Sequence, residues 1–264
     1  MKQRVVTGVL AGAVFLGLMI AGGHFYVALI VAMASIALIE FLKMNRISWN
    51  NPLALAAIVG LLAIVVPFHS YGIDWLSDMT ILWLLMFALL ALTVFSKNRY
   101  TIDEVAFTFL GTAYLGIGFA SMVDVRLMES NALWWSFLAF CAIWASDIGA
   151  YFFGRAFGKH KLTPLISPNK TVEGAIGGVV SSILIALVFA LLSPDLIELW
   201  RAVVLGVVAA VAGQLGDLMQ SAYKRVRGIK DMGNILPGHG GILDRTDSWI
   251  IVFPILVLTQ LIPV

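Results

Sequence analysis

The sequence is poor in charge and in cysteine, and both shortages restrict what the chain can be. Only 12% of its 264 residues are charged, whereas soluble domains carry about a quarter charged residues, so an ordinary soluble domain is excluded. The one cysteine, Cys141, excludes an intramolecular disulfide. The lack of a second cysteine, or of paired histidines at ligand spacing, argues against a zinc site.

Apolar residues make up most of what is present. The chain is 61% hydrophobic and its mean hydropathy is +0.96. A spanning helix needs roughly 20 apolar residues, because the hydrocarbon core is about 30 Å thick. We therefore predict an all-α, polytopic membrane bundle of about nine transmembrane helices, and we expect no nucleic-acid partner. The expected spans are 5–22, 24–42, 52–68, 79–95, 105–122, 131–153, 173–192, 201–222 and 246–263.

The basic residues test this arrangement, because Lys and Arg gather in cytoplasmic loops. When the chain is threaded from a cytoplasmic N-terminus, all of them except Arg126 and Arg201 fall on the cytoplasmic side. We therefore predict a multi-pass protein of the cell membrane whose N-terminus and active site face the cytoplasm. The residues that fall inside are Lys2, Arg4, Lys43, Arg46, Lys97, Arg99, Arg155, Lys159, Lys161, Lys170, Lys224, Arg225, Arg227, Lys230 and Arg245.

Four aspartates lie where the hydrocarbon disfavours them, at a cost on the order of 2.5–3.5 kcal/mol each. Asp147 and Asp217 fall in the cytoplasmic halves of the sixth and eighth spans, and Asp244 and Asp247 stand at the cytoplasmic start of the ninth. Clustered carboxylates suit a hard cation such as Mg²⁺, which keeps positions open for water and phosphate. The alternative is a set of structural ion pairs. The available partners are Lys170, Arg225 and Arg245.

Two cytoplasmic loops, 154–172 and 223–245, mix Gly, Pro, Lys and Asn, and long irregular loops tend to carry function. In the second loop, four cations precede a glycine-rich turn from Gly238 to Gly241 and then the last acidic pair. Glycines permit close backbone approach to phosphate, cations neutralise it, and a metal on the carboxylates bridges its oxygens. The residues alone predict a metal-dependent phosphate site, to which both loops contribute, in a single catalytic domain, 1–264.

Other polar or small residues are interpreted as structural. Glu40 stands three residues before Lys43 at a span end, where pairing and snorkelling account for it. Glu173 is expected to stabilise the first turn of its helix through the macrodipole. Small residues four apart let helices approach closely, and this spacing leaves a homodimer open. The pairs are Gly8 with Gly12 and Gly174 with Gly178.

The segment 221–247 contains a long signature: S, then K-R, four residues, K-D, a P-x-H-G-G segment and D-R-x-D. Tyr223 stands at a position where this signature usually has an aliphatic residue or Phe. The segment 167–174 looks like a second motif that accompanies the signature. The signature residues are Ser221, Lys224, Arg225, Lys230, Asp231, Pro237, His239, Gly240, Gly241, Asp244, Arg245 and Asp247. On these residues the chain resembles the phosphatidate cytidylyltransferases, or CDP-diacylglycerol synthases.

The resemblance implies that CTP and phosphatidic acid give CDP-diacylglycerol and pyrophosphate at the lipid bilayer. It implies Mg²⁺ on Asp217 and Asp244, with Asp247 and Asp147 as further ligands, and it allows a second cation. A phosphomonoester has a second pKa of about 6, so the attacking phosphate is already largely dianionic at neutral pH and no strong general base is needed. His239 is therefore expected to hydrogen-bond phosphate or to order the turn.

The same resemblance implies roles for the polar residues of both loops. The cations hold the CTP phosphates and the lipid head group, and the remaining residues line the site. Catalytic roles fall to Asp217, Asp244, Lys224, Arg225 and Arg245. Substrate-binding roles fall to Ser167, Asn169, Lys170, Ser221, Lys230, His239, Gly240 and Gly241.

Three other functions compete with this interpretation. CTP-dependent polyisoprenol or phytol kinases would release CDP instead of pyrophosphate. A transporter would place polar groups through the whole membrane, whereas these cluster at one side. CDP-alcohol phosphotransferases would need a D-G-x-x-A-R arrangement, which the sequence lacks.

Overall fold

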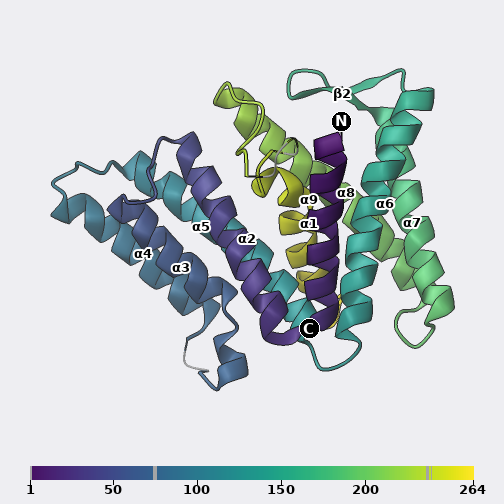
Figure 1. Cartoon of the computed structure of the whole chain (residues 1–264), viewed down its shortest axis with the longest axis horizontal. Coiled ribbons are helices and arrows are strands. Elements are labelled where there is room, and N and C mark those ends of the chain that lie inside the picture. The colour runs from purple at the N-terminus through teal and green to yellow at the C-terminus, as the bar shows by residue number, and fades with distance from the viewer. Residues whose placement is uncertain (1, 74–75, 236–237, 239) are drawn as a thin grey trace. The chain divides into compact units, whose positions relative to one another are not determined.

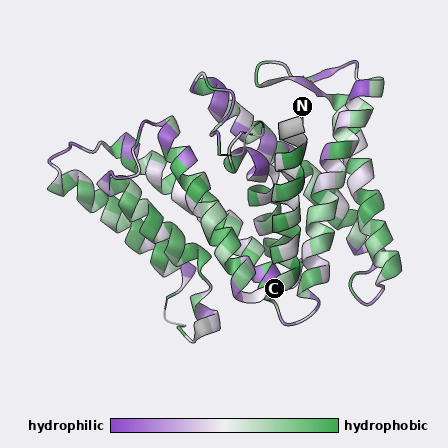
Figure 2. Ribbon diagram, in the orientation of Figure 1, coloured by the Kyte–Doolittle hydropathy of each residue, from purple (hydrophilic) through white to green (hydrophobic). Residues whose placement is uncertain are grey.

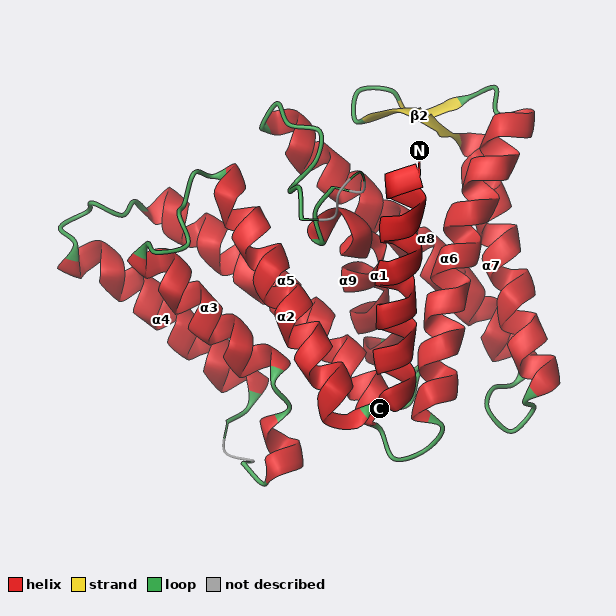
Figure 3. Ribbon diagram, in the orientation of Figure 1, coloured by secondary structure: helices red, strands yellow, loops and turns green. Residues whose placement is uncertain are grey.

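The computed structural model describes residues 2–73, 76–235, 238 and 240–264. Within these residues the chain forms α-helices, one short 3₁₀ helix and a two-stranded antiparallel hairpin (Figures 1 and 3). The helices are α1 (Lys2–Ala21), α2 (Gly23–Met44), α3 (Pro52–Val65), α4 (Asp78–Phe95), α5 (Ile102–Leu127), α6 (Ala132–Phe157), α7 (Val172–Leu192), α8 (Leu199–Val226) and α9 (Leu243–Leu258). The strands are β1 (Lys161–Thr163) and β2 (Ser167–Thr171), and the 3₁₀ helix is Phe68–Tyr71.

Six of the described helices, α2 and α4 to α8, are long and apolar enough to cross a membrane. In Figure 2 their ribbons are mostly hydrophobic, while hydrophilic residues gather in the connections and the hairpin. Shorter apolar helices cover Val6–Ala21 and Pro52–Val65. The prediction of an all-α, multi-pass membrane bundle is confirmed. The count of nine spans and the side of the N-terminus stay predictions.

The helices pack as two units. The first unit comprises Met1–Asp124 and Asp231–Arg245, and the second comprises Val125–Lys230 and Thr246–Val264. The last element, α9, therefore begins in the first unit and continues in the second.

In the first unit, local sequence signals set the helix boundaries. Gly22, with φ of 67°, is the single residue between α1 and α2, and glycine adopts this left-handed conformation without steric cost. A capping box begins α5: the Thr101 N–H donates to Glu104 Oε2 over 2.8 Å, and the Glu104 N–H donates to Thr101 Oγ1 over 3.3 Å. The helix therefore starts three residues before the predicted span. Its Phe107 stacks on Phe41 of α2, with ring centroids 4.5 Å apart.

In the second unit, glycines bring α6 and α7 into close contact. A Cβ built on Gly178 would lie 2.8 Å from the Ser146 carbonyl oxygen, and one on Gly174 would lie 2.8 Å from the Ala150 carbonyl oxygen. The small-residue pair of α7 thus packs against α6 of the same chain. Contact distances this short have no room for a methyl group.

The connection after α6 is ordered, so the prediction of an irregular loop over 154–172 is wrong. The last turn of α6 continues to Phe157, and β1 then pairs with β2, with Lys161 opposite Thr171 and Thr163 opposite Ser167. Paired strands satisfy the backbone groups of a segment that composition alone reads as a loop. The hairpin leads directly into α7, whose first turn is capped by the Thr171 hydroxyl accepting from the Gly174 N–H over 3.1 Å.

We expect Gly149→Ala to lower the melting temperature of the purified protein in detergent. The added Cβ would overlap Ser181 and lie 2.9 Å from the Gly177 carbonyl oxygen, so α6 and α7 must separate. Overpacking of this kind costs about 1–3 kcal/mol. Thermal unfolding followed by size-exclusion chromatography measures the change.

The matched control is Gly17→Ala in α1, where a Cβ would meet no other atom within 4 Å. Because Ala favours helices over Gly by about 1 kcal/mol, this variant should melt at the wild-type temperature or above it. Equal melting temperatures for the two variants would contradict the packing described for α6 and α7.

Candidate active site

In the first unit, Asp244 organises the segment that precedes α9, residues 231–242, called here the glycine-rich loop. Asp244 lies in the first turn of α9 and is 9% exposed. Its Oδ2 accepts hydrogen bonds from the Met232 N–H over 2.8 Å and from the Gly241 N–H over 3.0 Å. One carboxylate therefore ties the two ends of the loop to the start of the helix.

Glu40 of α2 binds the same region. Its side chain is 2% exposed, and its two oxygens accept from the Ile242 N–H over 3.2 Å and from the Leu243 N–H over 2.9 Å. Lys43 does attract the Glu40 carboxylate, as the sequence interpretation expects, but the hydrogen bonds of Glu40 come from elsewhere, so that interpretation is incomplete. A buried carboxylate needs donors, and Glu40 obtains them from a segment about 200 residues further along the chain.

The glycines of the loop lie against these two carboxylates. A Cβ on Gly233 or on Gly241 would overlap the carboxylate of Glu40, and a Cβ on Gly240 would lie 2.8 Å from Asp244 Oδ2. Gly240 also has φ of 86°, a backbone conformation in which residues other than glycine are strained. In this structure the glycines give room to the protein's own carboxylates. Pro237 and the proposed ligand His239 lie outside the described residues.

In the second unit, three aspartates interact electrostatically: Asp147 of α6, Asp217 of α8 and Asp247 of α9, called here the three-aspartate cluster. Asp147 is exposed, and Asp217 and Asp247 are half-buried. The Lys170 ammonium lies 2.6 Å from Asp217 Oδ2, and Lys224 interacts with Asp247. The cluster and these two lysines together carry more negative than positive charge.

Helical spacing places Gln214, Asp217, Ser221 and Lys224 along one face of α8, as a polar stripe. The Ser221 hydroxyl donates to Asp217 Oδ1 over 3.3 Å, and Gln214 Nε2 donates to the Ala175 carbonyl oxygen over 3.1 Å. The pair between Asp217 and Lys170 matches one of the structural ion pairs considered as the alternative role. It also holds a β2 cation, from the motif 167–174, against the acidic face of α8.

The remaining cations of the second unit lie on or after α8. Arg225 donates from Nε to the Ile166 carbonyl oxygen over 3.2 Å, so it fastens the hairpin turn to α8. That bond uses one of five guanidinium donors. Lys230 is exposed, and Lys224 is half-buried. These positions bring Lys170, Lys224 and Arg225 to the hairpin end of α8.

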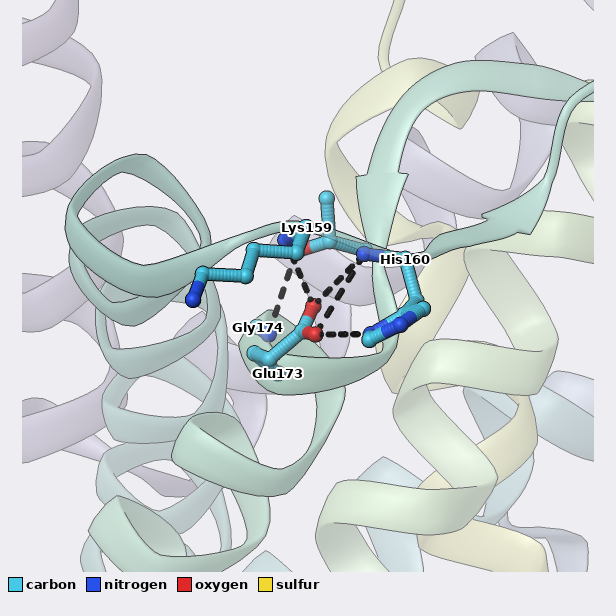
Figure 4. Close-up of polar contacts among 5 residues, drawn as sticks. Lys159, His160, Glu173 and Gly174 are labelled. Carbon is cyan, nitrogen blue, oxygen red and sulfur yellow. Dashed lines mark hydrogen bonds and ion pairs between the residues drawn. The ribbon is translucent and has the colours of Figure 1, made fainter.

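The base of the hairpin is held by Glu173 (Figure 4). Its carboxylate accepts from the Lys159 N–H over 3.0 Å, from the His160 N–H over 3.2 Å and from the His160 ring at 2.5 Å. The expected role of Glu173, support of its own helix turn, therefore misses its contacts with the segment before β1. The signal was present in the sequence as a carboxylate next to a short connection rich in cations.

The three-aspartate cluster fits Mg²⁺ by its chemistry. Mg²⁺ prefers oxygen ligands and is usually held by one or two carboxylates, with water and substrate phosphate supplying the rest. Among the described residues, no three acidic, histidine or cysteine side chains stand close enough together to form a metal site of their own. A cation here would therefore take most of its ligands from substrate and water.

The predicted site residues are distributed over both units. The first unit contains Gly240, Gly241, Asp244 and the exposed Arg245. The second unit contains Asp147, Ser167, Asn169, Lys170, Asp217, Ser221, Lys224, Arg225, Lys230 and Asp247. Within the second unit, the structure brings Lys170, Asp217 and Ser221 into direct contact. Ser167 is half-buried and Asn169 is exposed, both on β2.

Comparison with known proteins identifies the family. The family model described as "Cytidylyltransferase family" matches residues 2–262. The chain belongs to the cytidylyltransferase family. It is 42% identical over 258 residues to the phosphatidate cytidylyltransferase of Staphylococcus saprophyticus, covering 97% of both chains. It is 43% identical over 261 residues to that of Bacillus subtilis, covering 97% of this chain and 96% of the relative.

Membership of the cytidylyltransferase family says which chemistry a site in this chain must support. Transfer of a cytidylyl group brings together polyanions, so the site must screen negative charge and align the reacting groups. The lysines and Arg225 place positive charge at the hairpin end of α8, in the same unit as the three-aspartate cluster. The chain is an enzyme and a nucleotidyltransferase.

We expect Glu173→Ala to loosen the hairpin base, because the Lys159 and His160 N–H groups lose their acceptor. Trypsin should then cut after Lys159 or Lys161 several-fold faster, since cleavage requires local opening. Limited proteolysis followed by mass spectrometry measures both sites.

The control is Glu198→Ala, which removes an exposed glutamate that accepts a hydrogen bond from Trp200 at the start of α8. Cleavage after Lys159 and Lys161 should remain at the wild-type rate in this variant. An unchanged rate in Glu173→Ala itself would show that the hairpin base does not depend on the carboxylate.

Proposed function

We propose that this chain transfers the cytidylyl group of CTP to phosphatidate, giving CDP-diacylglycerol and pyrophosphate for phospholipid synthesis. The observation that carries the proposal is the 41–43% identity, over 97% of the chain, to relatives named phosphatidate cytidylyltransferase. The candidate membrane spans agree with a lipid substrate, whose acyl chains remain in the bilayer.

The reaction forms one bond and breaks one. A phosphate oxygen of phosphatidate attacks the α-phosphorus of CTP, and the bond from that phosphorus to the β-phosphate bridging oxygen breaks, releasing pyrophosphate. A phosphomonoester loses its second proton at about pH 6, so the attacking oxygen is largely ionised at neutral pH. The site therefore has no need of a strong base, and repulsion between the two anions is the barrier it must lower.

The cations of the chain lower that repulsion. Lys170, Lys224, Arg225, Lys230 and Arg245 would hold the CTP phosphates and the lipid head group, with Arg225 offering a planar fork for phosphate. The Lys170 ammonium is paired with Asp217. When substrate phosphate binds, Lys170 would exchange the Asp217 carboxylate for a phosphate oxygen. Ser167, Asn169, Ser221, His239 and the glycines Gly240 and Gly241 complete the proposed binding set.

Mg²⁺ would be held by Asp217, with Asp147 and Asp247 from the three-aspartate cluster. Asp244 stays in the proposed set because it stands three residues before Asp247 in α9, on the same helix face. When bound, the metal would supply charge neutralisation at the phosphate oxygens. The protein's own contribution is to keep acidic and basic side chains at the same end of α8.

The site is proposed to face the cytoplasm, where the basic residues of the sequence also fall. A homodimer through small residues four apart would have to use Gly8 and Gly12 of α1, because Gly174 and Gly178 pack against α6. A Cβ built on Gly12 would meet no other atom within 4 Å.

We expect the purified protein in detergent to form equal amounts of CDP-diacylglycerol and pyrophosphate from CTP and phosphatidate when Mg²⁺ is present. EDTA should stop turnover and added Mg²⁺ should restore it. Lipid chromatography and a coupled pyrophosphate assay follow the two products. Formation of CDP from CTP with a polyisoprenol, and none of the lipid product with phosphatidate, would contradict the assignment.

We expect Asp217→Asn to lower kcat by about 100-fold or more, a loss typical of removing one electrostatic group from a phosphate-transfer site. The control is Asp195→Asn, which should keep full activity. Asp195 lies in the connection between α7 and α8, at the end of both helices that is remote from the hairpin. The double variant Lys170→Gln with Asp217→Asn separates the two roles of Asp217. If the ion pair were only structural, removing both charges would restore turnover; we expect the double variant to stay inactive.

A further inference from the structure

A buried carboxylate of α2 is outside the signature of the family yet holds the segment that carries it. Glu40 is 2% exposed, and the donors to its two oxygens are the backbone N–H groups of Ile242 and Leu243. Leu243 is the first residue of α9. Glu40 thus serves as the acceptor for the start of a helix from which it is remote in sequence.

The start of α9 requires such an acceptor. The first N–H groups of a helix have no partner within it, and they carry a partial positive charge that favours an anion. Asp244 accepts from the Gly241 N–H, one residue before those bound by Glu40. Two carboxylates therefore accept from three consecutive N–H groups, those of residues 241–243.

Two glycines of the glycine-rich loop leave space for the Glu40 carboxylate. At Gly233 and Gly241, any side chain would overlap the Glu40 carboxylate. Gly233 stands outside the family signature, so its only described reason to be a glycine is its contact with Glu40. The carboxylate is consequently enclosed by the loop on more than one side.

We propose that Glu40 is a positioning residue for cytidylyl transfer, acting through the glycine-rich loop and the first turn of α9. It sets the conformation of Gly240 and Gly241 and the direction of the turn that bears Asp244 and Arg245. This proposal rests on the proposed function. Displacement of catalytic groups by about 1 Å costs about 100-fold in rate, so loss of the anchor acts mainly on turnover.

The first experiment compares Glu40→Gln and Glu40→Ala by two independent measurements. Steady-state kinetics gives kcat and KM for CTP and phosphatidate, and hydrogen–deuterium exchange gives the protection of the Ile242 and Leu243 amides. Glu40→Gln keeps the shape and one acceptor oxygen, so it should rank between wild type and Glu40→Ala. We expect kcat to fall about tenfold or more in Glu40→Ala, with KM values within about threefold of wild type.

The matched control is Glu104→Gln. Glu104 belongs to the same unit and also accepts a backbone N–H at a helix start, that of Thr101 over 2.8 Å, but far along the chain from the loop. It should leave kcat and the exchange of the loop amides unchanged. If the role of Glu40 were purely structural, Glu40→Ala would lower the melting temperature without lowering kcat selectively over the KM values.

A second experiment uses the steric contact of Gly233. Gly233→Ala should open the loop amides to exchange in the wild-type background, because the new methyl group overlaps Glu40. In the Glu40→Ala background the same substitution finds space, so its added effect should be small. Additive effects in the two backgrounds would overturn the contact between Glu40 and the loop.

The outcomes separate the two proposals. Glu40→Ala with exposed loop amides and wild-type kcat would refute the positioning role, and so would a loss of kcat with the amides still protected. If Glu40→Ala fails to fold, the ranking of Glu40→Gln against wild type decides the same question. If wild type makes no CDP-diacylglycerol, the proposed function fails, and the exchange data still show whether Glu40 holds the loop.

Discussion

The hydrogen bonds from backbone N–H groups to two buried carboxylates are the interactions on which the signature segment depends. Where water is scarce, an unpaired N–H at a helix start is costly, and so is an unpaired carboxylate. The hydrogen bonds to Glu40 and Asp244 offset part of both costs at once. The glycines at 233, 240 and 241 then follow as a steric consequence, since a side chain at any of them would enter the space of a carboxylate.

A related balance of charge holds the second unit. Asp217 binds Lys170 from β2 and Ser221 from its own helix, while Arg225 holds the hairpin turn through the Ile166 carbonyl oxygen. Each of these contacts ties the hairpin to α8. Several of the groups proposed to bind phosphate and metal are thus the same groups that hold the hairpin against α8.

The sequence was sufficient for the membrane bundle, because long apolar runs are local signals. The ends of α5, α6, α8 and α9 lie four or five residues from the predicted limits. The sequence was also sufficient for the family, since the signature from Ser221 to Asp247 is dense. It failed on 154–172, where glycine and proline suggested an irregular loop and the chain instead forms a hairpin. Strand pairing over so few residues has no period long enough to detect.

The candidate site was predictable in its residue types but only partly in its contacts. The contact of Ser221 with Asp217 is of the predictable kind, because residues four apart on a helix share a face. The role of Glu40 could not be predicted, because Lys43 one turn away offered a sufficient local partner. The glycines were assigned to phosphate because a sequence does not show which anion a glycine approaches.

The contact between Glu40 and the start of α9 also bears on biosynthesis. Its two partners are separated by 202 residues, and at about 5–20 residues per second the ribosome needs about 10–40 s to make the intervening chain. During that interval α2 is present while its carboxylate still lacks the donors of the finished protein. The first unit is therefore completed only after residues 231–245 have been made, and a chain that stops before residue 242 leaves the Glu40 carboxylate without its native partners.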